Sequence, residues 1–223
     1  LASLIIHAYS PNKIRSILKN LNLSYSDTEV AEIQEELYQR SIEFKTQELN
    51  KEALCLYIDA YHTKLKEQDS RKVTKAVIHT VIGVDLNGRK VVYGYYEFFG
   101  SENKEHWLMI LNDLINRGLK KCLLIISDDF SGLSEAISVL LPKTDHQLCF
   151  IHMQRNVRKH MGKEDANDFN DTLKSLKLYK DQTKAIDAFV KLCETYKKKY
   201  PSFIAHLLNN KERYFAFLKY PQS

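Results

Sequence analysis

Apolar side chains recur every three or four positions through the first fifty residues, which is the spacing of amphipathic helices. Ser10-Pro11 is typical of a helix start, and Ser26 with Glu29 has the pattern of a capping box ahead of a longer helix. Four glutamates on that second helix would repel phosphates. We therefore expect residues 1–50 to form an N-terminal helical arm that serves packing or dimerisation rather than DNA reading.

The pattern changes near residue 54 to apolar and β-branched runs that are typical of strands. Three strands are expected, near Leu54–Lys66, Val73–Val84 and Val91–Phe98. The polar stretch Glu67–Lys72 predicts the first turn. Asn87-Gly88, between Asp85 and Arg89, is a strong signal for a tight hairpin. Together these elements predict an antiparallel meander.

Helical and strand patterns then alternate. We expect a helix capped by Ser101 and ended by Gly118, and a short strand at Leu123–Ile126. A helix at Leu133–Leu141 and a fifth strand at Thr144–Phe150 complete the series. The order β-β-β-α-β-α-β predicts an α/β fold with a mixed five-stranded sheet. Residues 153–223 show only helical spacing. The expected domains are therefore residues 1–50, 51–152 and 153–223.

Charge and composition narrow the class of protein. The 223 residues carry a formal net charge of +5. Residues 153–223 hold 15 basic and 8 acidic side chains, a net of +7, so contact with a polyanion is most plausible there. No apolar stretch is long enough for a membrane span, and no signal peptide is evident. The 4 cysteines lie far apart, which favours reduced thiols in a cytoplasmic protein.

Two acids interrupt apolar strands. Asp59 lies inside the run Leu54–His62, and Asp128 directly follows Cys122–Ser127. A carboxylate in a buried strand costs several kcal/mol unless a cation or hydrogen bonds compensate. Two such carboxylates on neighbouring strands would make a divalent-metal site suited to phosphoryl transfer.

The two acids belong to a series of motifs that occur in this order: Tyr57–His62, Ser101–Trp107, Arg117–Leu119, Ser127-Asp128 with Gly132–Ala136, and Gln147–His152 followed by Arg155–Val157. Over residues 54–160 the chain resembles the Mutator-like family of insertion-sequence transposases. The resemblance implies an RNase H-like DDE catalytic core, flanked by the helical arm and a helical insertion. It implies metal-dependent phosphodiester hydrolysis and strand transfer at transposon ends.

The resemblance also implies roles for single residues. Asp59 and Asp128 would hold two Mg²⁺ (or Mn²⁺) ions, and His152 would orient the scissile phosphate or carry a proton. Cys149 would pack and support the strand end. The implied partners are double-stranded DNA and further copies of the chain, as a homodimer or higher assembly on DNA, in a nucleoid-associated, cytoplasmic protein.

Two departures from the family pattern affect these expectations. Asp129 replaces a small glycine after the second acid, and it would either cap the next helix or join the metal shell. A third acid is missing, because none of Glu164, Glu194 and Glu212 sits in a copy of the family's motif. We therefore expect the chain to be truncated and impaired on its own.

The sequence leaves several alternative functions and binding sites open. Arg155, Arg158 and Lys159 share one helical face, which suits either phosphate contact or a solvated surface. Zinc binding by Cys149 and His152 would need two more ligands. The alternative function is a non-catalytic nucleic-acid-binding or assembly module with a degenerate RNase H-like fold. A nuclease or integrase of the same fold is a third option.

Overall fold

The computed structural model describes residues 11–22, 26–66 and 72–221. The chain divides into two compact units, residues 1–48 and residues 49–223. The first unit contains helices α2 (Pro11–Asn20) and α3 (Asp27–Thr46). The capping box at the start of α3 is confirmed, because Ser26 Oγ accepts from Glu29 N at 3.2 Å and Glu29 Oε2 accepts from Ser26 N at 2.7 Å. The proposed cap Ser10 lies outside the described residues.

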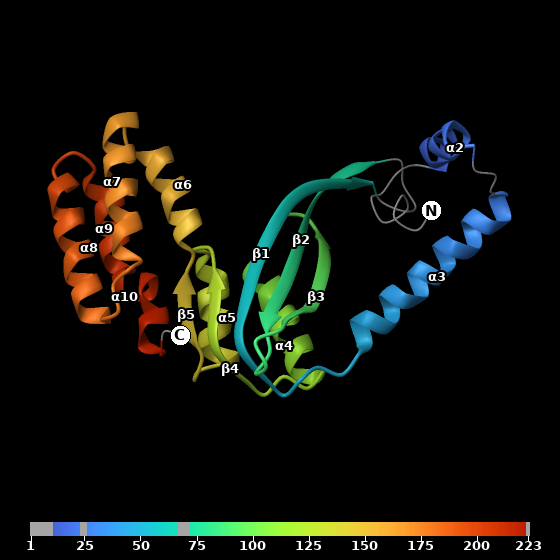
Figure 1. Cartoon of the computed structure of the whole chain (residues 1–223), viewed down its shortest axis with the longest axis horizontal. Coiled ribbons are helices and arrows are strands. Elements are labelled where there is room, and N and C mark those ends of the chain that lie inside the picture. The colour runs from blue at the N-terminus through green and yellow to red at the C-terminus, as the bar shows by residue number, and fades with distance from the viewer. Residues whose placement is uncertain (1–10, 23–25, 67–71, 222–223) are drawn as a thin grey trace. The chain divides into compact units, whose positions relative to one another are not determined.

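The second unit is built on one five-stranded sheet (Figure 1). Its strands are β1 (Glu52–Lys66), β2 (Val73–Val84), β3 (Lys90–Phe99), β4 (Lys121–Ser127) and β5 (Asp145–Leu148). The order is β3-β2-β1-β4-β5. Strands β1, β2 and β3 pair antiparallel, whereas β4 pairs parallel with β1 and with β5. This confirms the predicted mixed five-stranded sheet. Most of the first expected turn, residues 67–71, lies outside the described residues.

The second hairpin closes as the Asn-Gly signal predicts. Gly88 has a φ of +76°, a conformation that glycine adopts without steric cost. Asp85 N donates to Arg89 O at 3.0 Å, and the Asp85 carboxylate accepts from Asn87 N and Arg89 N at 2.9 Å each. The Arg89 guanidinium also donates to Asp85 from Nε at 2.9 Å. These bonds hold the turn between β2 and β3.

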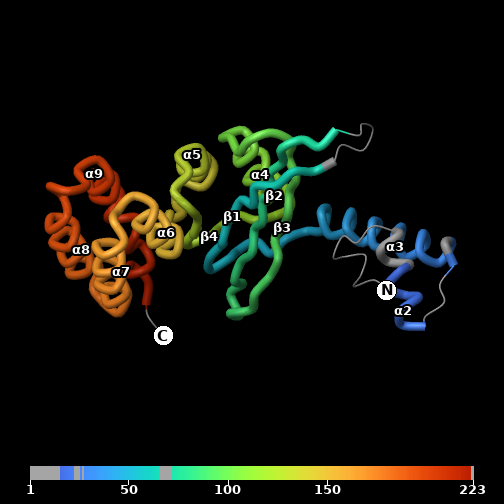
Figure 2. Tube along the Cα trace, turned by 90° about the horizontal axis from the view of Figure 1, so that it is seen from above, coloured from blue at the N-terminus to red at the C-terminus, as the bar shows by residue number. Residues whose placement is uncertain are grey.

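Helices α4 (Lys104–Asn116) and α5 (Ser131–Leu140) pack side by side (Figure 2) and share a core with the sheet. Trp107 is fully buried in this core, as expected. The expected cap Ser101 is wrong: Asn103 caps α4, and its Oδ1 accepts from His106 N at 2.9 Å. Gly118 follows the helix end with a φ of +117°, as predicted.

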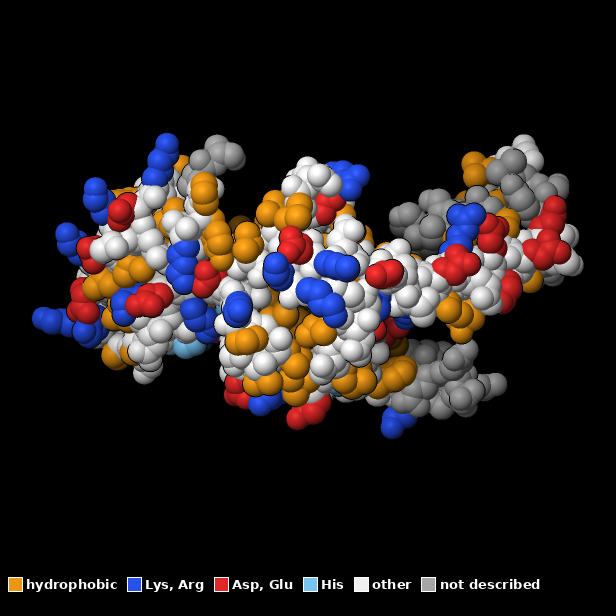
Figure 3. All heavy atoms as spheres, turned by 90° about the horizontal axis from the view of Figure 1, so that it is seen from below, with side chains coloured by type: hydrophobic (Ala, Val, Ile, Leu, Met, Phe, Trp, Pro, Cys, Tyr) orange, Lys and Arg blue, Asp and Glu red, His pale blue; other side chains and the backbone are white. Residues whose placement is uncertain are grey.

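The rest of the chain is helical, as its spacing predicts. The helices are α6 (Phe150–His160), α7 (Lys163–Leu176), α8 (Gln182–Tyr196), α9 (Pro201–Asn209) and α10 (Lys211–Tyr214), followed by the 3₁₀-helix η1 (Ala216–Lys219). They enclose a second hydrophobic cluster that includes Phe169, Phe189 and Phe215. Basic and acidic side chains alternate over this end of the unit (left in Figure 3). None of the described helices has the length and apolarity to cross a bilayer.

Polar contacts join the second hydrophobic cluster to the sheet. The buried Gln147 of β5 donates from Nε2 to Tyr214 O at 2.7 Å, and its Oε1 accepts from Phe217 N at 3.0 Å. Lys219 and Tyr220 both contact the Asp145 carboxylate, at 2.7 and 2.8 Å. The end of the described chain is therefore held along β5.

Candidate active site

The two predicted acids lie at the same level of neighbouring strands. In the parallel pair of β1 and β4, Tyr57 lies opposite Ile126. Two residues further along each strand are Asp59 and Asp128, and side chains two apart point to the same face. Asp59 is exposed, whereas Asp128 is half-buried just beyond the end of β4. The fold therefore brings the two carboxylates to one place on the sheet.

The electrostatics of Asp128 agree with this placement. Burial raises the pKa of the Asp128 carboxyl, and the neighbouring carboxylates of Asp59 and Asp129 raise it further. His152 and His62 act in the opposite direction and lower the pKa of Asp128. Burial is thus the largest cause of the raised pKa of Asp128, and the neighbouring carboxylates and imidazoles act in opposite directions on it.

The Cys-x-x-His element joins a strand directly to a helix. The predicted fifth strand was too long, because β5 ends at Leu148 and α6 begins at Phe150. Cys149 N donates to Ser127 O at 2.7 Å, and Cys149 O accepts from Met153 N at 3.0 Å. The first bond joins the ends of β5 and β4, and the second is the first hydrogen bond of helix α6. Cys149 therefore supports the chain end beside Asp128, and its sulfur takes no part in capping α6.

His152 lies in the first turn of α6, close enough to Asp128 to affect its pKa. Its Nδ1 is buried and has no hydrogen-bond partner among the described residues. A buried polar atom without a partner costs about 1–3 kcal/mol. The hydrogen-bonding capacity of this nitrogen is therefore unused among the described residues.

Sequence reasoning missed two further side chains at the site, Glu102 and His62. Glu102 Oε1 accepts from Trp107 Nε1 at 2.8 Å, and Glu102 Oε2 lies 3.4 Å from His62 Nε2. Burial raises the pKa of Glu102, and the charge of Asp128 raises it further. Both residues belong to motifs that carry the family resemblance, which was the one available signal. Nothing in the local sequence indicated that the two side chains meet.

Asp129 turns toward the C-terminal helices. The cap position of α5 is Phe130 without a side-chain cap bond, so the expectation that Asp129 caps this helix is wrong. Instead, Asp129 Oδ2 lies 2.7 Å from His206 Nε2 and accepts from Asn210 Nδ2 at 3.1 Å. Arg213 Nη1 is 3.6 Å from Asp129 Oδ1. The acid that departs from the family pattern thus anchors α9 and α10 beside Asp128.

A chain of hydrogen bonds runs from Arg213 to the same loop. Arg213 Nη2 donates to His146 Nδ1 at 2.9 Å, so the other ring nitrogen, Nε2, carries the proton. His146 Nε2 contacts Ser127 Oγ at 2.7 Å, and Ser127 Oγ donates to Asp128 O at 2.7 Å. Burial and the Arg213 charge lower the pKa of His146 to about 3, which keeps the ring neutral. The backbone at Asp128 is therefore tied to α10.

The three predicted DNA-binding residues Arg155, Arg158 and Lys159 lie on α6 and are exposed. The described part of the chain provides no ion-pair partner for any of them. Arg158 and Lys159 lie in the last turn of the helix, where cations also interact favourably with its dipole. The helix therefore carries exposed positive charge about two turns beyond His152.

A metal ion at this site would need water and substrate oxygens as ligands in addition to the protein carboxylates. Among the described residues, no three His, Cys, Asp or Glu side chains form a group that could hold a metal ion, which also leaves the zinc alternative without support. Mg²⁺ often takes only one or two carboxylates and completes its shell with water and phosphate oxygens. Asp59 and Asp128 fit that donor set.

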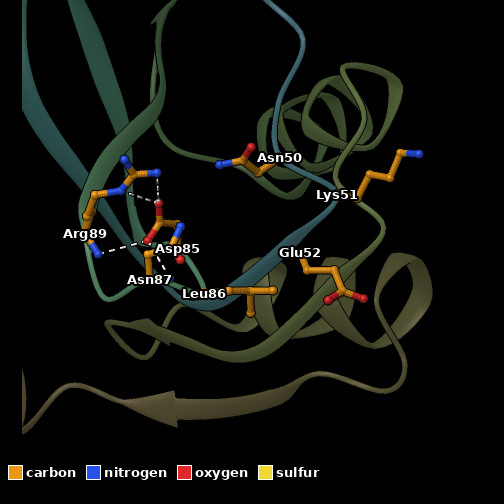
Figure 4. A pocket seen from close by; sticks show the side chains of 7 residues that line it. All are labelled: Asn50, Lys51, Glu52, Asp85, Leu86, Asn87 and Arg89. Carbon is orange, nitrogen blue, oxygen red and sulfur yellow. Dashed lines mark hydrogen bonds and ion pairs between the residues drawn. The ribbon is translucent and has the colours of Figure 1, made fainter.

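A pocket at the opposite end of β1 offers no comparable chemistry. Its lining includes Asn50, Lys51, Glu52 and the β2–β3 turn (Figure 4). The Asp85 carboxylate there is occupied by Asn87 and Arg89. The pocket therefore belongs to the hairpin rather than to the acid site.

Curated proteins similar to the chain include insertion-sequence transposases. It is 26% identical over 197 residues to the transposase of insertion sequence element IS905 from Lactococcus lactis subsp. lactis (strain IL1403), covering 88% of the chain and 49% of the relative. It is 24% identical over 227 residues to the transposase of IS1201 from Lactobacillus helveticus, covering 100% of the chain and 60% of the relative. The chain thus spans about half the length of the curated relatives it matches.

Among solved structures, the Drosophila P element transposase strand transfer complex aligns with a TM-score of 0.41 at 14% identity, over 98% of this chain and 62% of that chain. The family model described as "Transposase, Mutator family" matches residues 1–223. With that match over its whole length, the chain belongs to the Mutator family of transposases.

Proposed function

We propose that the chain supplies the catalytic core of a metal-dependent DNA transposase, which hydrolyses phosphodiester bonds at transposon ends and transfers the cut strands. Residues 51–152 would form the core, with residues 1–50 as an arm and residues 153–223 as a helical insertion. The observation that carries the proposal is the placement of Asp59 and Asp128 at one level of adjacent parallel strands. Family membership supports the reaction class.

In this proposal, Asp59 and Asp128 hold Mg²⁺ or Mn²⁺. When held by these two carboxylates, the cations would supply Lewis-acid chemistry, namely activation of the attacking water or 3′-hydroxyl and stabilisation of the leaving oxygen. Half-buried Asp128, just beyond the end of β4, would supply one carboxylate. Asp59, exposed on the neighbouring strand, supplies the second carboxylate.

His152 orients the scissile phosphate or moves a proton. Its unpartnered Nδ1 supports this role, because the nitrogen can donate to a phosphate oxygen when protonated and accept a proton when neutral. Cys149 supports it indirectly by fixing the first turn of α6 against β4.

Double-stranded DNA, as transposon end and target, is the proposed partner, with a homodimer or higher assembly of the chain on it. Arg155, Arg158 and Lys159 would contact phosphates, which confers affinity and salt dependence rather than sequence preference. Their exposure on α6 beyond His152 supports this assignment.

The test is cleavage of transposon ends by the full-length protein. Asp59→Asn and Asp128→Asn should each abolish cleavage while thermal unfolding shows a folded protein. Asp187→Asn, on the exposed face of α8, is the matched control and should cleave normally. Unchanged cleavage by either active-site variant would refute the proposal.

The absence of a three-ligand group among the described residues favours one alternative, a non-catalytic DNA-binding or assembly module. Calorimetric titration of the chain with Mn²⁺ separates the two functions. The catalytic proposal expects binding that Asp128→Asn removes. The alternative expects no binding to the wild-type chain.

A further inference from the structure

A second polar pocket lies near the proposed active site, at the far end of β1. It is formed where β1 and the start of β2 meet the loop that precedes α4. The side chains and backbone that line it come from His62, Thr63, Lys64, Lys75, Ala76, Gly100 and Ser101. Among the described residues, the lining thus collects three basic side chains and two hydroxyls, and no acid.

Two of those basic residues face each other across the strands. Lys64 of β1 lies directly opposite Lys75 of β2 in the antiparallel register. Side chains of directly opposed residues lie on the same face, with Cβ atoms about 4.5–5.5 Å apart, and like charges there are destabilising. Both lysines are exposed, and the described residues provide neither with an ion pair. The free protein therefore retains a repulsion that an anion between the two ammonium groups would remove.

His62 connects this pocket to the acids. It lines the pocket, lies 3.4 Å from Glu102 Oε2 and lowers the pKa of Asp128. Glu102 lies beside His62, whereas the two lysines have no ion-pair partner among the described residues. Lys64 is five residues beyond Asp59, about 17 Å along a strand, and this odd spacing places its side chain on the other face of β1, the face that His62 shares. One strand of duplex DNA passes about five phosphates over that length.

We propose that this pocket binds a backbone phosphate of the DNA strand that enters the acid site, held between Lys64 and Lys75 with the Ser101 hydroxyl beside it. The inference rests on the proposed function, since it names a contact for the same DNA substrate. Such a contact positions the strand and carries no sequence information. It also explains why two lysines oppose each other at the end of a sheet.

The test compares Lys64→Gln/Lys75→Gln with a control, Lys90→Gln/Lys120→Gln, in the full chain. The control lysines are exposed and lie at the other end of the sheet. Binding of a fluorescently labelled DNA duplex is measured by anisotropy across a salt series. The pocket variant should lower the slope of log affinity against log salt by about one, the value for one phosphate contact. The control should keep its slope or lose the same small amount of affinity at every salt concentration.

A second measurement tests the anion site without DNA. Inorganic phosphate should raise the thermal unfolding midpoint of the wild-type chain and of the control, and this rise should vanish in the pocket variant. In low salt without phosphate the pocket variant should be at least as stable as wild type, because a repulsion is gone; this also shows that it folds.

The two assays separate the possible failures. Equal salt slopes for pocket and control variants overturn the proposal, and so does a wild-type chain on which phosphate has no effect. Normal DNA cleavage by Asp59→Asn together with a reduced salt slope in the pocket variant would refute the catalytic function while supporting the phosphate contact.

Discussion

Replacing Arg213 by Met tests whether the C-terminal helices hold the loop that carries Asp128. The Arg213 guanidinium donates to Ser134 Oγ at 2.6 Å, to His146 Nδ1 at 2.9 Å and to Asn210 Oδ1 at 3.1 Å. It also lies 3.6 Å from Asp129 Oδ1. Met keeps most of the length and apolar stem of the side chain and removes all of these contacts at once.

The expected loss can be worked from these contacts. A hydrogen bond to a charged group contributes about 1.5–3 kcal/mol when buried. The Arg213 side chain is 30% exposed, so water replaces part of what is lost. We expect a net loss of about 3 kcal/mol, at the lower end of the range of about 3–5 kcal/mol for breaking a buried ion pair. For a unit of this size, about 2–4 °C per kcal/mol gives a fall of about 6–12 °C in the unfolding midpoint.

Thermal unfolding followed by far-ultraviolet circular dichroism measures this effect directly. Arg213→Lys retains the charge without the planar fork and should fall between wild type and Arg213→Met. Lys184→Met, on exposed α8, is the control for adding a methionine and should change the midpoint little. A fall of less than about 2 °C in Arg213→Met would refute the reasoning, since that is the scale of a surface substitution.

Two further predictions follow from buried polar groups. Trp107→Phe removes the hydrogen bond to Glu102 and should lower the free energy of unfolding by about 2 kcal/mol in urea denaturation, whereas an unchanged value would show that the bond contributes nothing. The pKa of His146 is about 3 in the folded chain, below its ordinary value of 6.5, so the unfolded state binds the extra proton. His146 should therefore make stability fall as the pH drops from about 6.5 toward 3, and His146→Gln should flatten that fall; equal pH profiles would contradict this.

Elements with strong local signals could be predicted from the sequence. Strand β2 is bounded by a polar turn and an Asn-Gly pair, and its predicted limits Val73–Val84 are those observed. The capping box at Ser26 likewise needs only residues three apart. The start of α4 was misplaced because Ser101 and Asn103 are both good caps, and the local sequence does not decide between them. The β5–α6 boundary was misplaced because Leu148 and Phe150 fit both an apolar strand and a helix face.

The same difference between local sequence signals and tertiary contacts decides which residues of the candidate site could be predicted. Asp59 and Asp128 could be identified from the sequence because a carboxylate is unusual in an apolar strand. The parallel pairing of β1 and β4 then places them close together. The pairing of Glu102 with His62 depends on tertiary contact across 40 positions of the chain, and Asp129 meets Asn210 across 81 positions. Neither periodicity nor spacing in the sequence indicates such contacts, so only the folded structure identifies these partners.

The separation of residues 49–223 into two hydrophobic clusters has a consequence for how this part of the chain evolves. Gln147 and Arg213 bridge the clusters through hydrogen bonds of defined geometry. Helices α7 and α8 pack within the second cluster and supply neither of these bridging residues. Insertions or exchanges within α7 and α8 would then leave the acid-bearing strands undisturbed, provided that these two bridging residues keep their partners.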